Sequence, residues 1–137
     1  MTTPALGAPP EFRFGPVSRT DLVRYAGASG DFNPLHHDET FARAAGLPGV
    51  MAHGMFSAGL LGSFLIAWVG ERPIRRFRVR FLSPVWPGDT LSAGGEILGG
   101  GGTVAHLALR LWREDGAEVV TGEAEVECAD GREGASH

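Results

Sequence analysis

Apolar residues recur with two different periods along this chain, a helical period in the first half and an alternating one in the second. Ser18 is a suitable N-cap and Asp21 follows three residues later, so we expect a helix over 19–28. A shorter helix is expected over 39–45. Residues 54–69 are apolar on nearly every side, which predicts a helix that is buried on most of its faces.

The second half reads as antiparallel strands. Residues 74–82 alternate between arginines and large apolar side chains, as a half-buried strand does. Asp115-Gly116 predicts a tight hairpin, and the four glycines over 99–102 predict a flexible turn. The remaining expected strands are a short one at 12–14 and longer ones at 90–98, 103–114 and 118–128.

These elements predict one α+β domain. A sheet of this length beside one long apolar helix is most simply satisfied if the antiparallel sheet wraps around the helix at 54–69. We expect this domain to occupy 11–128, with flexible tails at 1–10 and 129–137. A sheet of about five strands leaves an open edge, which invites pairing with a second chain.

Composition narrows the function. The chain has 137 residues and a net charge of −4, so nothing indicates a nucleic-acid partner. The single cysteine, Cys128, excludes an internal disulfide and argues against a metal-thiolate site, which suits a reducing compartment. The first ten residues lack the features of a signal peptide, and the apolar run at 60–69 is too short to span a membrane. We therefore expect a cytoplasmic protein.

The candidate chemistry lies between the predicted helices. Asp31 and His36 are on a segment that Pro34 keeps out of regular helix, and such irregular segments often carry working side chains. Gly54 stands where the long helix begins, with its N–H free to stabilise a developing negative charge. A carboxylate, an imidazole and such a donor are the parts needed to add or remove water next to a carbonyl.

The sequence resembles the MaoC-like, or (R)-specific enoyl-CoA hydratase, branch of the hotdog-fold proteins. It is also similar to the small 3-hydroxyacyl dehydratase subunits of actinobacterial fatty-acid and mycolic-acid synthesis. The resemblance covers about 17–127 and is most specific in its first block. The matching residues are 25–36, then Asp38, Ala42 and Gly46, then 52–55, and then Phe81 with 84–91.

This resemblance implies roles for individual residues. Asp31 and His36 would be a catalytic dyad that binds one water and interconverts 2-enoyl and (R)-3-hydroxyacyl thioesters of coenzyme A or acyl carrier protein. His36 would be the general base toward water and Asp31 its partner, or the reverse. The Gly54 N–H would receive the thioester oxygen. No metal and no organic cofactor is required.

Other positions near this motif have two readings each. Asn33 is expected to brace the loop, with a supporting role in the site. His53 either packs at the helix start or lines the site. Relatives often carry a helper serine further along the helix, where this chain has Gly62, so Ser57 is a candidate for that role. The histidines at 36, 37 and 53 suggest a possible metal site. The side chains of adjacent histidines face different ways, which argues against one.

The arginines of the expected strand also have two readings. Arg76, Arg78 and Arg80 either form a solvated face beside the glutamates at 123–127, or contact phosphates of coenzyme A or a carrier protein. We favour the first reading for Arg78, and keep Arg75 and Arg76 as candidates for the second.

Two other functions remain open. Hotdog proteins also include thioesterases, which use an acid on the central helix, and 54–69 contains none. The chain could instead be the partner subunit of a two-chain dehydratase, although the presence of both Asp31 and His36 favours an active role. The family resemblance implies dimers, either of two identical chains or with a related hotdog subunit.

Overall fold

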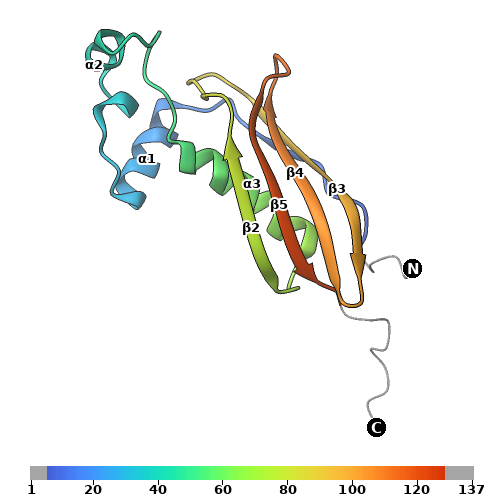
Figure 1. The fold of residues 1–137 in the computed structure, drawn as a ribbon. Coiled ribbons are helices and arrows are strands. Elements are labelled where there is room, and N and C mark those ends of the chain that lie inside the picture. The colour runs from blue at the N-terminus through green and yellow to red at the C-terminus, as the bar shows by residue number, and fades with distance from the viewer. Residues whose placement is uncertain (1–5, 129–137) are drawn as a thin grey trace.

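The computed structural model describes residues 6–128, and Figure 1 shows their arrangement. The helices are α1 (Arg19–Ser29), α2 (Glu39–Ala44) and α3 (Gly54–Val69), with a short 3₁₀ turn η1 (Pro34–His36). The strands are β1 (Phe12–Phe14), β2 (Ile74–Phe81), β3 (Leu91–Gly101), β4 (Val104–Arg113) and β5 (Glu118–Glu127).

The five strands form one antiparallel sheet in the order β1-β3-β4-β5-β2, and α3 lies along one face of it (Figure 1). β1 comes first in the chain yet pairs with β3, where Phe12 is opposite Ala93. The α1 and α2 helices lie together beyond one end of the sheet. This architecture confirms the predicted hotdog fold, a sheet wrapped around a central helix.

The core lies between α3 and the sheet. Leu61, Phe64 and Leu65 are fully buried on α3, and they meet buried side chains such as Leu107 and Val120 from the central strands. Burying a side chain of this size stabilises the fold by about 1.5–3 kcal/mol. Buried and exposed positions alternate along β4 and β5, whereas β2, which was expected to be half-buried, is exposed along nearly its whole length, because it is an edge strand.

The ends of the domain differ from expectation. Leu6 is buried, and the Trp68 indole N–H donates a hydrogen bond of 2.8 Å to the carbonyl of Gly7. Contacts distant in sequence thus hold Leu6 and Gly7, which lie inside the flexible tail predicted for 1–10, although residues 7–10 are exposed. The tail predicted for 129–137 lies outside the described residues.

The glycine run at 99–102 was expected to be a turn, and most of it is strand. Gly99, Gly100 and Gly101 pair with β4, and the register shifts between Ile97 and Gly99. The hairpin is made only by Gly102-Thr103, with Gly102 in the left-handed conformation at φ 64°. Backbone pairing with β4 thus extends β3 through residues that have little strand propensity of their own.

The central helix is less buried than its composition predicts. The Phe81 ring lies close to Gly54, and the Phe77 ring lies over Gly62, so these two glycines give strand β2 close access to α3. Beside Gly62 on the same helix face, Met55 and Ile66 are both 60% exposed. This uncovered apolar surface lies on the helix that the sequence predicts to be enclosed.

Candidate active site

The loop that carries Asp31 is built by local hydrogen bonds. Gly30 ends α1 in the left-handed conformation, which turns the chain toward the site. The Asp31 carboxylate accepts a hydrogen bond from the Asn33 N–H (3.2 Å), and the Asn33 side chain accepts one from the Leu35 N–H (3.0 Å) and so caps η1. In this structure Asn33 therefore makes the bracing contact.

His36 is held by one of its two nitrogens. Its Nδ1 lies 2.7 Å from the carbonyl oxygen of Met51. A carbonyl can only accept, so Nδ1 carries the proton and Nε2 keeps a free lone pair. The Met51 N–H donates in turn to the Leu35 carbonyl (3.1 Å), so the His36 segment and the residues before α3 are joined on both sides.

The free nitrogen of His36 faces the carboxylate of Asp31. Nε2 lies 3.9 Å from Oδ2, too far for a direct hydrogen bond. One oxygen atom placed to the side could lie about 2.8 Å from both atoms. The His36 side chain is 10% exposed and that of Asp31 53% exposed, so the pair lies at the boundary between the fold and solvent.

Gly54 supplies a backbone donor beside this pair. It is the first residue of α3, where N–H groups have no partner within the helix, and its N–H has no other partner among residues 6–128. A Cβ at this position would lie 3.4 Å from the Phe81 ring. The helix dipole adds partial positive charge at the same place.

His53 connects these groups. Its Nε2 lies 2.9 Å from the Asp31 carbonyl oxygen, and its ring stacks on that of His36 with centroids 3.7 Å apart. Tyr25 of α1 packs against it at 4.8 Å. Because His53 immediately precedes Gly54, the structure brings Asp31, His36 and the Gly54 amide into one neighbourhood, as the sequence predicts.

An apolar hollow of about 390 Å³ adjoins this neighbourhood. Its wall includes Met51, His53, Gly54 and the buried Ser57 on one side and residues of the 81–86 segment on the other. Hollows of this size commonly hold small ligands, and mainly apolar walls suit an acyl chain. Ser57 therefore lines the hollow, whereas Asp31, Asn33 and His36 do not.

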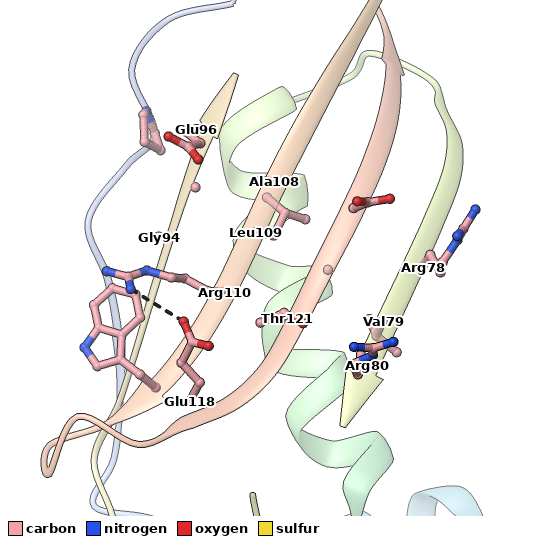
Figure 2. A pocket seen from close by; sticks show the side chains of 15 residues that line it. Arg78, Val79, Arg80, Gly94, Glu96, Ala108, Leu109, Arg110, Glu118 and Thr121 are labelled. Carbon is pink, nitrogen blue, oxygen red and sulfur yellow. Dashed lines mark ion pairs between the residues drawn. The ribbon is translucent and has the colours of Figure 1, made fainter. Parts of the chain in front are cut away.

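A larger hollow of about 1090 Å³ lies on the face of the sheet turned away from α3 (Figure 2). Arg78 and Arg80 stand at one side of it and the ion pair Arg110–Glu118 (3.6 Å) at the other. Its walls include neither Asp31 nor His36, so the hollow is separate from the candidate chemistry.

The arginines of β2 are placed as the solvated-face reading predicts. Arg78 is opposite Glu123 and Arg76 is opposite Glu125 in the β2–β5 register, and Arg75 forms an ion pair with Glu127 at 3.1 Å. Cross-strand neighbours of opposite charge stabilise a sheet. This register supports the structural role, and phosphate contact by Arg75 or Arg76 stays a prediction.

Asp31, His36 and His53 offer ligand atoms within 4.8 Å of one another, the spacing of a possible metal site. The two imidazoles stack at 3.7 Å with an angle of 25° between their planes, so their lone pairs lie in two separate, nearly parallel planes, which is unfavourable for binding one ion. The Nε2 of His53 is also committed to a carbonyl. This geometry gives no reason to assign a metal here.

An ion pair joins the helices α1 and α2 near the site. Arg19 of α1 binds Glu39 of α2, and this hydrogen bond, together with the Val50 backbone, lowers the pKa of the Glu39 carboxyl. The contact joins α1, α2 and the segment that leads to α3. It joins the first turn of α1 to the first turn of α2, the two helices that flank in sequence the loop carrying Asp31 and His36.

Three contacts in the site were not predicted from sequence: the Met51 carbonyl that fixes His36, the Tyr25 ring on His53, and the Phe81 ring over Gly54. A backbone carbonyl has no sequence signal. Tyr25 and Phe81 stand within the matching motifs, which was the available signal, but their contacts depend on tertiary packing.

Comparison with known proteins agrees with the geometry. A family model described as MaoC like domain matches residues 2–104. The (R)-specific enoyl-CoA hydratase of Aeromonas caviae is 35% identical over 124 residues, covering 83% of this chain and 86% of that protein. Fatty acid synthase beta subunit TOXC of Cochliobolus carbonum is 36% identical over 107 residues, but this chain spans only 5% of its length.

A solved structure shows the same fold. The ChsH1-ChsH2 complex from Mycobacterium tuberculosis superposes with a TM-score of 0.82 at 24% identity, over 94% of this chain and 100% of the other. Within residues 6–128, no helix has the length and apolar character needed to cross a membrane. The family match and the fold agree: the chain belongs to the MaoC-like domain family of hotdog proteins.

Proposed function

We propose that this chain catalyses the reversible, (R)-specific hydration of 2-enoyl thioesters to 3-hydroxyacyl thioesters. The observation that carries this proposal is the pair of atoms His36 Nε2 and Asp31 Oδ2, 3.9 Å apart, with the His36 tautomer fixed by Met51. Such a pair can bind one water molecule and take a proton from it. The related Aeromonas caviae hydratase supports the same reaction class.

The reaction divides among the residues as follows. His36 Nε2 accepts a proton as the water oxygen bonds to C3 of the enoyl group. Negative charge then moves to the thioester oxygen, where the Gly54 N–H and the α3 dipole stabilise it. Asp31 orients the water, and the proton that His36 accepted passes through Asp31 to C2, so that the OH ends on C3, the hydrogen on C2 and the dyad regains its starting protonation. The reverse allocation between Asp31 and His36 remains an alternative. Water is added without a change in oxidation state, so the step requires no cofactor.

The rival functions are less well supported. A hotdog thioesterase would need an acid on the central helix, and 54–69 has none. A non-catalytic partner subunit would not need Asp31 and His36 held in register. The proposal includes either coenzyme A or acyl carrier protein as the carrier of the acyl group. It also includes a cytoplasmic location.

We further propose that a second hotdog chain, either another copy or a related subunit, covers the exposed side of α3. Met55 and Ile66 are 60% exposed there, and the neighbouring edge strand β2 carries Phe77 and Phe81 with exposures of 38% and 51%. An open edge beside an apolar surface is a typical pairing site. A partner placed there would also stand close to Gly54 and the apolar hollow.

The test is hydration of crotonyl-CoA by the purified chain, measured as the loss of the enoyl absorbance. Asp31→Asn and His36→Ala are each expected to lower kcat by about 100- to 10,000-fold. His106→Ala is the matched control, since His106 lies on the outer sheet face with a half-exposed side chain. Substantial activity retained by either dyad variant would contradict the assignment.

A further inference from the structure

His53 has an environment that its position as N-cap of α3 does not explain. Its side chain makes no capping hydrogen bond, yet the residue is only 2% exposed. An imidazole has two polar nitrogens, and burying both is costly unless they have partners. The reason for a histidine here must therefore lie in what its ring and its one bonded nitrogen contact.

The bonded nitrogen holds the backbone of Asp31. Nε2 lies 2.9 Å from the Asp31 carbonyl oxygen, which can only accept, so Nε2 carries the proton. Nδ1 is then the unprotonated nitrogen, and it is buried without a hydrogen-bond partner among the described residues. The single proton of His53 is committed to a carbonyl, so this residue has none to exchange with a substrate.

The ring holds His36. The two imidazoles stack at 3.7 Å with an angle of 25° between their planes. The hydrogen bond from His36 Nδ1 to the Met51 carbonyl and the Cβ–Cγ bond hold one edge of that ring, so the motion left to it is a tilt of the ring plane. A flat surface packed on the ring face removes the remaining freedom and keeps Nε2 directed at Asp31.

We propose that His53 is a positioning residue that sets the distance within the dyad, holding Asp31 through its Nε2–H and His36 through its ring face. The inference rests on the proposed function, and it assigns to His53 a task distinct from lining the substrate. The hydrogen bond to Asp31 and the stacking on His36 are both made by the residue that precedes Gly54. One side chain thereby places acid, base and backbone donor relative to one another.

The two holds can be separated by substitution. His53→Phe keeps a flat ring against His36 and removes the donor to Asp31. His53→Gln keeps an N–H near the position of Nε2 and removes the ring. His53→Phe loses the hydrogen bond to Asp31 but also removes a buried nitrogen that has no partner. These two effects on stability oppose each other, so the change in Tm should be small even where the effect on turnover is large.

The experiment combines kinetics with NMR on the full chain. With crotonyl-CoA, both variants should lower kcat, by on the order of 100-fold if the dyad moves by about 1 Å, while KM changes by less than about threefold. In His53→Gln the ¹⁵N signals of His36 should show mixed tautomers. In His53→Phe they should stay Nδ1-protonated, while the Asn33 amide, which reports on the Asp31 loop, exchanges faster.

The opposite results would overturn the proposal. These are wild-type kcat in both variants, or, in folded protein and whatever the activity, an unchanged His36 tautomer in His53→Gln together with unchanged Asn33 exchange in His53→Phe. If one variant fails to fold, NMR on the other variant still tests the contact of His53 that this other variant removes. If the wild-type chain hydrates no enoyl thioester, the proposed function has failed, whereas the NMR signals still report whether His53 sets the positions of Asp31 and His36.

Discussion

His36 directs its free Nε2 at the Asp31 carboxylate across 3.9 Å, while its Nδ1 is bound to a backbone carbonyl. The separation is too long for a direct hydrogen bond and short enough for both groups to bind the same oxygen atom. A pair locked by a direct hydrogen bond would have to open before water could enter. In this structure the two groups are already set apart.

The oxyanion role of Gly54 can be tested by removing its N–H. In Gly54→Pro the donor is lost, yet proline is well tolerated at the first position of a helix. The preceding His53 has φ −62° and ψ 140°, a conformation compatible with a following proline. We expect kcat for crotonyl-CoA to fall by about 100- to 1000-fold.

Gly54→Ala is the matched control for that substitution. It keeps the N–H and adds the same Cβ, which would lie 3.4 Å from the Phe81 ring. Its crowding effect can therefore be subtracted from that of Gly54→Pro. Equal kcat values in the two variants, with both folded by circular dichroism, would remove Gly54 from the mechanism.

The Asn33 brace predicts an effect on both stability and turnover. Asn33→Ala removes the acceptor for the Leu35 N–H, and losing a cap of this kind costs about 1 kcal/mol. Because Asn33 braces the loop that carries Asp31, its loss should disturb the dyad, so kcat should fall more than KM rises. Asn33→Ser keeps a capping oxygen and should recover most of both values in urea unfolding and hydration assays. A turnover defect in Asn33→Ser as large as that in Asn33→Ala would argue against bracing.

Much of the fold could be predicted because its signals are local. The Ser18–Asp21 capping box is present at α1, and the Asp115-Gly116 hairpin joins β4 to β5 as expected. Each depends on residues within a few positions of one another, where propensity and capping act. The alternation along β4 and β5 likewise requires only that one sheet face be buried.

The errors concern contacts between distant residues. Gly99 is in a strand because β4 pairs with it, and Leu6 is buried because α3 and the sheet leave a place for it. In the site, motif matching could name Asp31 and His36 as a pair. It could not show that His53 holds both, since stacking and a backbone hydrogen bond depend on the tertiary arrangement alone.

The ion pair between Arg19 and Glu39 predicts a pH dependence of stability. Arg19 holds the pKa of Glu39 below its usual value of 4.5. A carboxyl whose pKa is lower in the folded state stabilises the protein above its unfolded pKa, and this stabilisation is lost as pH falls through the folded value. Glu39→Gln should therefore lower the free energy of unfolding near pH 7 and have a smaller effect near pH 3, because the stabilisation declines as pH falls below 4.5.

Urea unfolding at both pH values measures this difference. Glu71→Gln is a suitable control, because Glu71 follows α3 and forms no ion pair among the described residues. It should change stability little at either pH. A Glu39→Gln effect of the same size at both values would mean that the carboxylate charge contributes nothing, and that the side chain acts only through packing.

The exposed surface of α3 predicts an oligomer. Ile66 on α3 and Val23 on α1 are both 60% exposed, so in an isolated chain a glutamate at either position should change stability by less than about 0.5 kcal/mol. If a second copy covers α3, only Ile66→Glu places an unpaired charge in an apolar interface, which is strongly unfavourable. Light scattering should then give twice the 14.5 kDa chain mass for the wild type and Val23→Glu, and the single mass for Ile66→Glu. A wild-type chain that remains at the single mass at high concentration, yet hydrates crotonyl-CoA, would show that neither a second copy nor a related subunit is needed to complete the site.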